Sequence, residues 1–126
     1  MKDIAIYGFG GYGREIASII KSINIVKPTW NIIGFFDDDQ SKLGLENEYG
    51  KVLGGIDFVN SYDKELSVVM AIASPNVLEK IITNINNPNL SFPNIIAPTV
   101  FFFDKETVNI GYGNVICHHC RVSTDV

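Results

Sequence analysis

Hydrophobic residues between positions 1 and 93 follow two alternating patterns, continuous apolar runs and stripes with helical spacing. Apolar runs of strand length occupy residues 3–8 (DIAIYG), 31–39 (NIIGFFDDD) and 66–74 (LSVVMAIAS). Apolar residues three or four positions apart form two stripes, which comprise Ile16, Ile19, Ile20 and Ile23, then Leu78, Ile81, Ile82 and Ile85. Strands that alternate with amphipathic helices indicate βαβ units. The pattern therefore predicts an α/β fold with a small Rossmann-like parallel sheet.

Two further segments complete this reading of the first part of the chain. Residues 51–63 (KVLGGIDFVNSYD) return toward the sheet after a stretch that we expect to be irregular. Pro75 precedes the second stripe and suits the first turn of a helix, where its missing N–H has no intrahelical partner to lose. We therefore expect that helix to begin at Pro75.

The composition changes at residues 86–98 (NNPNLSFPNIIAP), which are rich in asparagine and proline. We place a domain boundary there and predict two units, residues 1–93 and residues 94–126. In the second unit Ile110, Ile116 and Val122 recur every six residues, a period typical of a parallel β-helix. A β-hairpin with these residues in its core is the alternative. A solenoid needs about three repeats and a cap, so we expect this sequence to be part of a longer chain.

Composition and charge limit the classes of partner. The chain has 126 residues, of which 46% are hydrophobic and 19% charged, a profile typical of globular proteins. A net charge of −4 without any cluster of lysine and arginine argues against nucleic acid and membrane surfaces as partners. The first apolar run is too short for a signal peptide, and no segment approaches the roughly 18 apolar residues of a membrane span. We therefore expect a cytoplasmic protein.

The sequence CHHC, residues 117–120, contains both cysteines and both histidines of the chain. Neighbouring side chains on an extended strand point to opposite faces, so these four cannot converge on one metal ion. We expect Cys117 and Cys120 to be structural thiols, and we expect no metal site. At hexapeptide spacing Ile116 and Cys120 point inward, whereas His118 and His119 face outward.

A glycine-rich loop follows the first predicted strand. Gly8, Gly10 and Gly13 fit G-x-G-x-x-G between a strand and a helix, where such glycines allow a tight turn, close approach of a diphosphate and close helix packing. The helix N-terminus favours an anion, and Arg14 in its first turn opposes the helix dipole unless an anion meets it. The alternative is a tight turn without a ligand, in which Arg14 points to solvent.

Three carboxylates, Asp37, Asp38 and Asp39, end the second predicted strand. A dinucleotide fold places the acidic residue that binds a ribose hydroxyl at about this position. Three carboxylates would repel the 2′-phosphate of NADP, whereas NAD and a uridine nucleotide remain open, since a carboxylate can accept the imide N–H of uracil. Asp39 can instead serve as an Asx turn or N-cap in DDDQSKLG.

Taken in order, five motifs resemble a known family. The motifs IYGFGGYGREIASII, NIIGFFDDDQSKLG, KVLGGIDFV, VVMAIASPNVLEKII and NIIAPTV…VNIGYGNVI resemble the N-terminal domain and first coils of the sugar O-/N-acyltransferases, which include sialic-acid O-acetyltransferases and bacillosamine-pathway N-acetyltransferases. In that family the α/β domain binds a UDP-sugar or related acceptor. A left-handed β-helix forms a homotrimer and binds acetyl-CoA between subunits. The resemblance thus implies acetyl transfer from acetyl-CoA to a hydroxyl or amine of a sugar.

The resemblance also implies roles for individual residues. Tyr12 takes a position usually held by histidine or an aromatic residue, and Asp37 and Asp38 face the uracil, whereas Gly8 and Arg14 are candidate binding residues on the ground of the glycine motif itself. The diphosphate loop is implied to comprise Gly10, Gly11 and Gly13, and the strand-end loop near the sugar to comprise Ala73, Ser74 and Asn76.

This sequence departs from the family pattern at two positions. Leu78 stands where the family commonly has an arginine, and Ala97 replaces a histidine before Pro98. The family's catalytic histidine is implied to lie beyond residue 126, so no catalytic residue is assigned, and His118 and His119 are not taken as substitutes. A non-catalytic nucleotide-sugar sensor and an NAD-binding module remain the alternatives.

Overall fold

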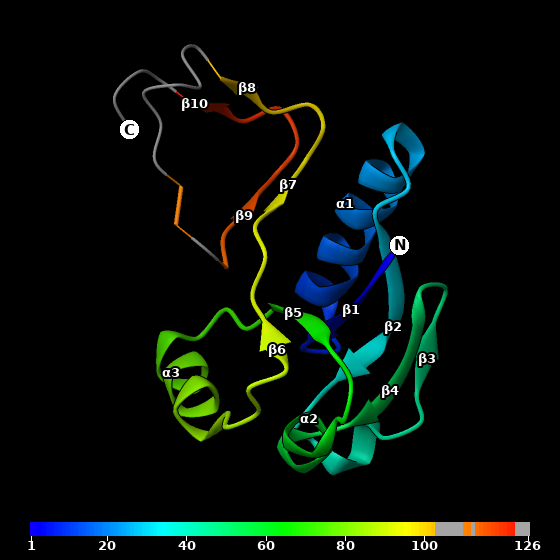
Figure 1. Cartoon of the computed structure of the whole chain (residues 1–126), viewed down its shortest axis with the longest axis vertical. Helices are drawn as coiled ribbons and strands as arrows, with labels where there is room; N and C mark the ends of the chain where they lie inside the picture. Colours follow the sequence, from blue (N-terminus) through cyan, green and yellow to red (C-terminus); the bar gives the residue numbers. More distant parts are fainter. Residues whose placement is uncertain (103–109, 112, 123–126) are drawn as a thin grey trace.

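The computed structural model describes residues 1–102, 110–111 and 113–122 of the chain (Figure 1). Its main feature is a sheet with the strand order β3-β4-β2-β1-β5-β6. The strands are β1 (Lys2–Tyr7), β2 (Trp30–Phe36), β3 (Glu46–Asn47), β4 (Gly50–Gly54), β5 (Leu66–Met70) and β6 (Leu90–Ser91). All neighbours are parallel except β3, which is antiparallel to β4. The predicted Rossmann-like sheet is confirmed.

Helices connect the parallel strands and cover both faces of the sheet (Figure 1). They are α1 (Gly11–Val26), α2 (Ile56–Ser61) and α3 (Pro75–Asn84), with a short 3-10 helix, η1 (Gln40–Lys42), after β2. The alternating residues of β1 divide the core in two: Ile4 and Ile6 pack with α1, whereas Ala5 and Tyr7 pack with α2 and α3. The period of two along a strand produces this division.

The two predicted helical stripes fare differently. In α1 the residues Ile16, Ile19 and Ile20 are buried, as predicted. In α3, which begins at Pro75 as expected, the prediction is wrong at Ile82, which is 51% exposed. α3 buries Ile81 in the core, while Ile82 lines a cavity at the edge of the sheet.

The elements that the sequence analysis did not predict include the short strands β3 and β6, and α2, which occupies the latter part of the segment 51–63 that was expected to return to the sheet. β3 pairs with β4 as a hairpin within the stretch expected to be irregular; Asn47 Oδ1 accepts a hydrogen bond of 2.8 Å from Tyr49 N–H, and Gly50 has φ of +155°. β6 lies within the asparagine- and proline-rich segment and pairs with β5. Two-residue strands carry too little alternation to be seen in a sequence.

After the sheet, short strands pair in parallel across about twenty positions of sequence. β7 (Ile95–Ile96) pairs with β9 (Val115–Ile116), and β8 (Phe101–Phe102) pairs with β10 (Arg121–Val122). The side chain of Asn94 accepts a hydrogen bond of 2.8 Å from Asn114 N–H, 20 residues away. The antiparallel hairpin alternative is therefore wrong for these strands. Parallel pairing supports the predicted left-handed β-helix, which stays a prediction.

Residues of the two predicted units pack together. Ile95 and Ala97 are buried in the same core cluster as the apolar face of α1. This shared packing does not define a boundary between residues 93 and 94, which stays a prediction. Among the described residues, no helix combines the length and apolarity that crossing a bilayer requires.

Candidate functional site

The loop between β1 and α1 lies where the strand order of the sheet reverses. From β1 the chain winds to β2 and β4 on one side, then continues with β5 and β6 on the other. Backbone hydrogen bonds between neighbouring strands continue one residue past the strand ends: Gly8 N–H donates to Phe36 O, and Ala71 N–H donates to Tyr7 O. In open α/β sheets, ligands bind in the crevice at the carboxyl ends of the strands beside this reversal. The predicted glycine loop thus lies at the expected ligand-binding edge.

Gly8 and Gly13 are required by the fold itself. Gly8 has φ of +125°, and a Cβ on it would lie 2.5 Å from the carbonyl oxygen of Ala71. A Cβ on Gly13 would lie 2.0 Å from the carbonyl oxygen of Gly8. These two glycines let the chain turn and let α1 begin against β1.

Gly10 and Gly11 are not required in this way. A Cβ on either would have no atom within 4 Å outside its chain neighbours, and Gly10 has φ of −147°, which any residue adopts. Gly10 caps α1 without a side-chain hydrogen bond, and the first turn holds no acidic residue. The backbone beside the helix N-terminus is thus open to a ligand, and the helix dipole favours an anion there.

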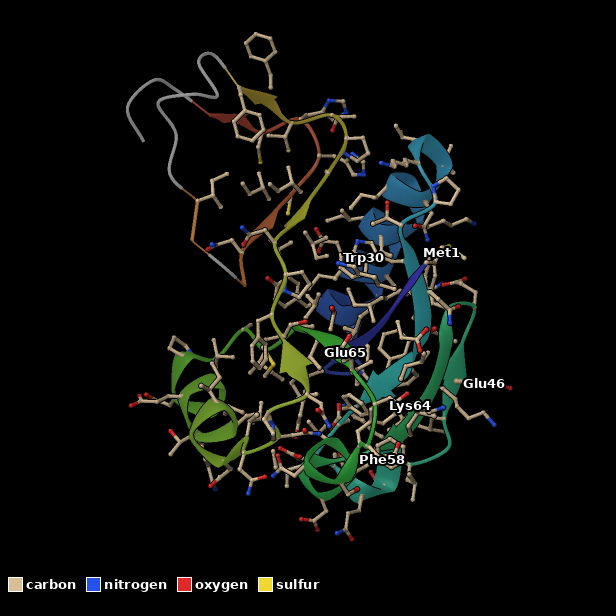
Figure 2. The ribbon with its side chains drawn as sticks, viewed as in Figure 1. Met1, Trp30, Glu46, Phe58, Lys64 and Glu65 are labelled. Atoms are coloured by element: carbon tan, nitrogen blue, oxygen red, sulfur yellow. The ribbon has the colours of Figure 1, made fainter. Side chains whose placement is uncertain are left out.

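Arg14 forms an ion pair within the chain. Its Nη2 lies 2.6 Å from Oε1 of Glu48, in the turn between β3 and β4, and both side chains are more than half exposed. The ion pair stands beside a hollow of about 330 Å³. Its lining comprises Phe9, Gly10, Gly11, Arg14, Glu46 and Asn47. Figure 2 shows Glu46 on the hairpin that forms one side of this hollow.

Asp37 supports the glycine loop. Its Oδ2 accepts a hydrogen bond of 2.9 Å from Phe9 N–H, and its Oδ1 accepts one of 2.9 Å from Asp39 N–H. Lys42 Nζ lies 3.6 Å from Oδ2. Both oxygens of Asp37 are thus used within the chain, and one of them fixes the backbone between Gly8 and Gly10.

Within the part of the chain that the structure describes, Asp38 accepts hydrogen bonds on one oxygen. Its Oδ1 accepts hydrogen bonds from the Tyr7 hydroxyl at 2.5 Å and from Ile56 N–H at 3.2 Å. Burial raises the pKa of Tyr7 far above its usual value, and the hydrogen bond to Asp38 and the charges of Asp38, Asp37 and Asp57 raise it further. The tyrosine is therefore a neutral donor to the side chain of Asp38.

Asp38 also lines a second cavity, of about 470 Å³. The cavity lining comprises Asp37, Asp38, Gln40, Leu43, Gly54, Gly55, Ile56 and Asp57. Figure 2 labels Phe58, which directly follows the lining residues Ile56 and Asp57 on α2. The structure therefore brings Asp37 and Asp38 to one cavity and the glycines to the neighbouring hollow.

Asp39 has the local role that the sequence suggested. It is the N-cap of η1, where its Oδ1 accepts hydrogen bonds from the backbone N–H and the hydroxyl of Ser41. The Ser41 hydroxyl first, and then its N–H, lower the pKa of this carboxyl below its usual value.

A third cavity, of about 480 Å³, lies between the glycine loop, α3 and the start of the C-terminal segment. Its lining comprises Tyr12, Met70, Ile72, Leu78, Ile82, Phe92, Gly113, Asn114 and Val115. Sequence reasoning singled out Tyr12 and Leu78 but missed Phe92 and Val115, which no spacing along the chain connects with β5. The predicted sugar loop residues Ala73, Ser74 and Asn76 lie exposed at the start of α3.

The CHHC segment lies apart from the glycine loop in sequence. His118 Nδ1 is 2.8 Å from the Thr99 hydroxyl, and His119 is exposed with φ of +61°. Of the two histidines expected to face outward, His119 is exposed and His118 is half-buried, in contact with the exposed side chain of Thr99. Cys117 and Cys120 are free and half-buried, and Cys117 packs against the core. No three metal-binding side chains come together within the described part of the chain.

Comparison with solved structures shows that the fold recurs in an acetyltransferase domain and in a protein solved with CoA and GDP-perosamine. The acetyltransferase domain of PglB from Neisseria gonorrhoeae FA1090, in complex with acetyl coenzyme A, has a TM-score of 0.71 at 20% identity, over 98% of this chain and 60% of that chain. PerB from Caulobacter crescentus, in complex with CoA and GDP-perosamine, has a TM-score of 0.75 at 16% identity, over 99% of this chain and 56% of that chain. At these identities the likeness shows the fold.

The sequence itself identifies the family. Comparison with curated proteins gave no match. The sequence model of the family described as the PglD N-terminal domain matches residues 3–85, from β1 to the end of α3, which is more than half of the chain. The chain therefore belongs to the PglD N-terminal domain family.

Proposed function

We propose that this chain supplies the acceptor-binding part of an acetyl-CoA-dependent sugar acetyltransferase. The observation that carries the proposal is the open backbone at Gly10 and Gly11, whose glycines the fold does not require. A diphosphate group fits this position, because the N-terminus of α1 favours an anion and Arg14 lies beside it, where a bound diphosphate would share this guanidinium with Glu48. PglB with acetyl coenzyme A and PerB with CoA and GDP-perosamine support the same class of reaction.

The nucleobase of the acceptor would bind in the cavity beside Asp38. An ionised carboxylate accepts a hydrogen bond from a ring N–H, which both uracil and guanine possess. A UDP-sugar remains our proposed acceptor, and the GDP-sugar bound by PerB is the second nucleotide to test. Ala73, Ser74 and Asn76 at the start of α3 are proposed to contact the sugar, and Tyr12 to border it.

The proposed chemistry is acyl transfer. A hydroxyl or amine of the sugar attacks the thioester carbonyl of acetyl-CoA, the new C–O or C–N bond forms, the C–S bond breaks and CoA leaves. A general base takes the proton of the nucleophile. We assign no residue of this chain to that role; the described residues bind and orient the acceptor. We further propose a homotrimer that binds acetyl-CoA between subunits, and a cytoplasmic location.

Calorimetric titration tests the binding part of this proposal. The ligands are UMP, UDP-N-acetylglucosamine, GDP-mannose and NAD, each titrated into the chain and into its Asp38→Ala variant. We expect the chain to bind a UDP-sugar or GDP-sugar, and Asp38→Ala to weaken that binding. Binding of NAD alone would overturn the proposal in favour of a dinucleotide-binding module, and binding of none would leave the glycine loop a turn.

Acetyl transfer needs a separate assay. The chain covers 60% of the PglB chain and 56% of the PerB chain, so the assay uses a protein of comparable full length that contains this sequence. We expect CoA release that depends on the nucleotide sugar. Tight sugar-nucleotide binding without CoA release would instead assign a sensor module.

A further inference from the structure

We propose that Tyr7 is a positioning residue for nucleobase recognition: it holds one oxygen of Asp38 so that the other oxygen alone meets the base. This inference rests on the proposed function, since it assigns a role within the same acceptor site. It concerns a buried side chain that the glycine motif does not include.

Tyr7 is a core residue with a polar group that the core does not need. Its side chain is 0% exposed, and its ring packs at an edge-to-face angle of 63° on Phe36, with centroids 5.9 Å apart. Phenylalanine would supply the same packing. A buried hydroxyl costs free energy unless it is hydrogen-bonded, and its partner here is Asp38 Oδ1 at 2.5 Å. The hydroxyl therefore serves Asp38.

Two backbone features fix the same oxygen of Asp38 from the other side. Ile56 N–H donates to Oδ1 at 3.2 Å. Gly55 leaves room for this arrangement, because a Cβ on Gly55 would lie 3.1 Å from Oδ1. Among the described residues no group donates a hydrogen bond to Oδ2 of Asp38, and Asp38 lines the cavity of about 470 Å³. Oδ2 is thus the oxygen left to accept from a ligand.

The neighbouring carboxylate, Asp37, differs from Asp38 because both of its oxygens accept hydrogen bonds. Asp37 uses both oxygens within the chain, toward Phe9 N–H and Asp39 N–H. A ligand that bonds Asp37 would share an oxygen with one of these donors, and one of them shapes the glycine loop. The two adjacent aspartates therefore divide the work: Asp37 holds the loop that meets the diphosphate, and Asp38, held by Tyr7, meets the base.

The test compares Tyr7→Phe with the unaltered chain by calorimetry, with UMP and inorganic pyrophosphate as probes. Removal of the hydroxyl frees the Asp38 carboxylate to turn, so we expect UMP affinity to fall about tenfold and pyrophosphate affinity to stay the same. In the Asp38→Ala background, Tyr7→Phe should have no further effect on UMP. A merely structural role would weaken both probes alike and would persist without Asp38.

Two controls distinguish a loss of UMP binding from a loss of folding. Thermal unfolding of Tyr7→Phe shows whether the variant is folded, and Gly55→Ala disturbs the same Asp38 oxygen from the opposite side with Tyr7 intact. We expect Gly55→Ala to repeat the selective loss of UMP affinity. If the unaltered chain binds UMP and Tyr7→Phe binds it equally well, the inference is wrong while the proposed function stands. If the unaltered chain binds neither UMP nor the nucleotide sugars, both are wrong.

Discussion

The Cα of Gly13 lies against the carbonyl oxygen of Gly8, so closely that a Cβ on Gly13 would lie 2.0 Å from that oxygen. This contact brings the residue after β1 against the first turn of α1. The fold therefore requires glycine at positions 8 and 13, whereas Gly10 and Gly11 have open space around them.

Gly13→Ala should therefore destabilise the chain severely. The methyl group meets backbone atoms, which cannot move without shifting α1 from β1. We expect a loss of about 3 kcal/mol or more in the free energy of unfolding, measured by urea denaturation. A variant of unchanged stability would show that the loop does not pack as described.

Gly11→Ala is the matched control, and it should not lower the free energy of unfolding. Gly11 is the first residue of α1 and has open space around it. Alanine is the better helix former by up to about 1 kcal/mol, so the free energy of unfolding should stay the same or rise. Destabilisation comparable to that of Gly13→Ala would contradict the distinction between the two glycines.

Asn87 links α2 to the segment before β6, and its loss should be costly. Its Nδ2 donates to the carbonyl oxygens of Val59 and Tyr62, and its Oδ1 accepts from Asn89 N–H. Asn87→Ala takes a donor from the carbonyl oxygens of Val59 and Tyr62 and an acceptor from Asn89 N–H, so we expect about 2 kcal/mol of destabilisation in thermal unfolding. Asn86→Ala is the control, because the contact there uses its backbone N–H. Equal losses in the two variants would refute this role.

The stability of the chain should fall above pH 10 because of Tyr7. Its pKa is raised in the folded state above the ordinary 10.0, so the unfolded chain releases the proton first. The contribution of Tyr7 is complete below pH 10 and is lost as the pH rises toward the folded-state pKa. Urea denaturation at pH 8 and pH 11 should show a larger loss for the unaltered chain than for Tyr7→Phe. Identical pH dependence would mean that Tyr7 ionises freely in the fold.

Sequence patterns predicted the parts of this fold that repeat. The run before Gly8 is continuously apolar because β1 is buried on both faces, and the stripe from Ile16 to Ile20 is periodic because α1 buries one face against the core. Asp39 was suggested as an Asx turn or N-cap because an aspartate in a turn sequence accepts a hydrogen bond from the backbone N–H two residues later, here that of Ser41.

The contacts that define the site could not be predicted from the sequence. The bonds from Tyr7 to Asp38 and from Phe9 to Asp37 join residues 31 and 28 positions apart, and only the strand register brings them together. The partner of Arg14 was missed because Glu48 lies in a hairpin too short to show a period. Ile82 was expected in the core because a stripe does not reveal how wide a surface the helix covers.

The central claim, that the glycine loop binds the diphosphate of a nucleotide sugar, is tested most directly with Gly10→Asp and Gly10→Asn. Gly10 is the N-cap of α1 with extended backbone, where both residues are preferred caps, so each variant should fold at least as stably as the original. The two side chains have nearly the same size, but aspartate places a negative charge where the phosphates would bind. Both variants are titrated with UDP-N-acetylglucosamine and GDP-mannose.

We expect Gly10→Asn to weaken binding of the nucleotide sugar and Gly10→Asp to weaken it at least tenfold more, since the charge repels the diphosphate. Equal, undiminished affinity in both variants would contradict the account, because it would place the ligand away from the glycine loop.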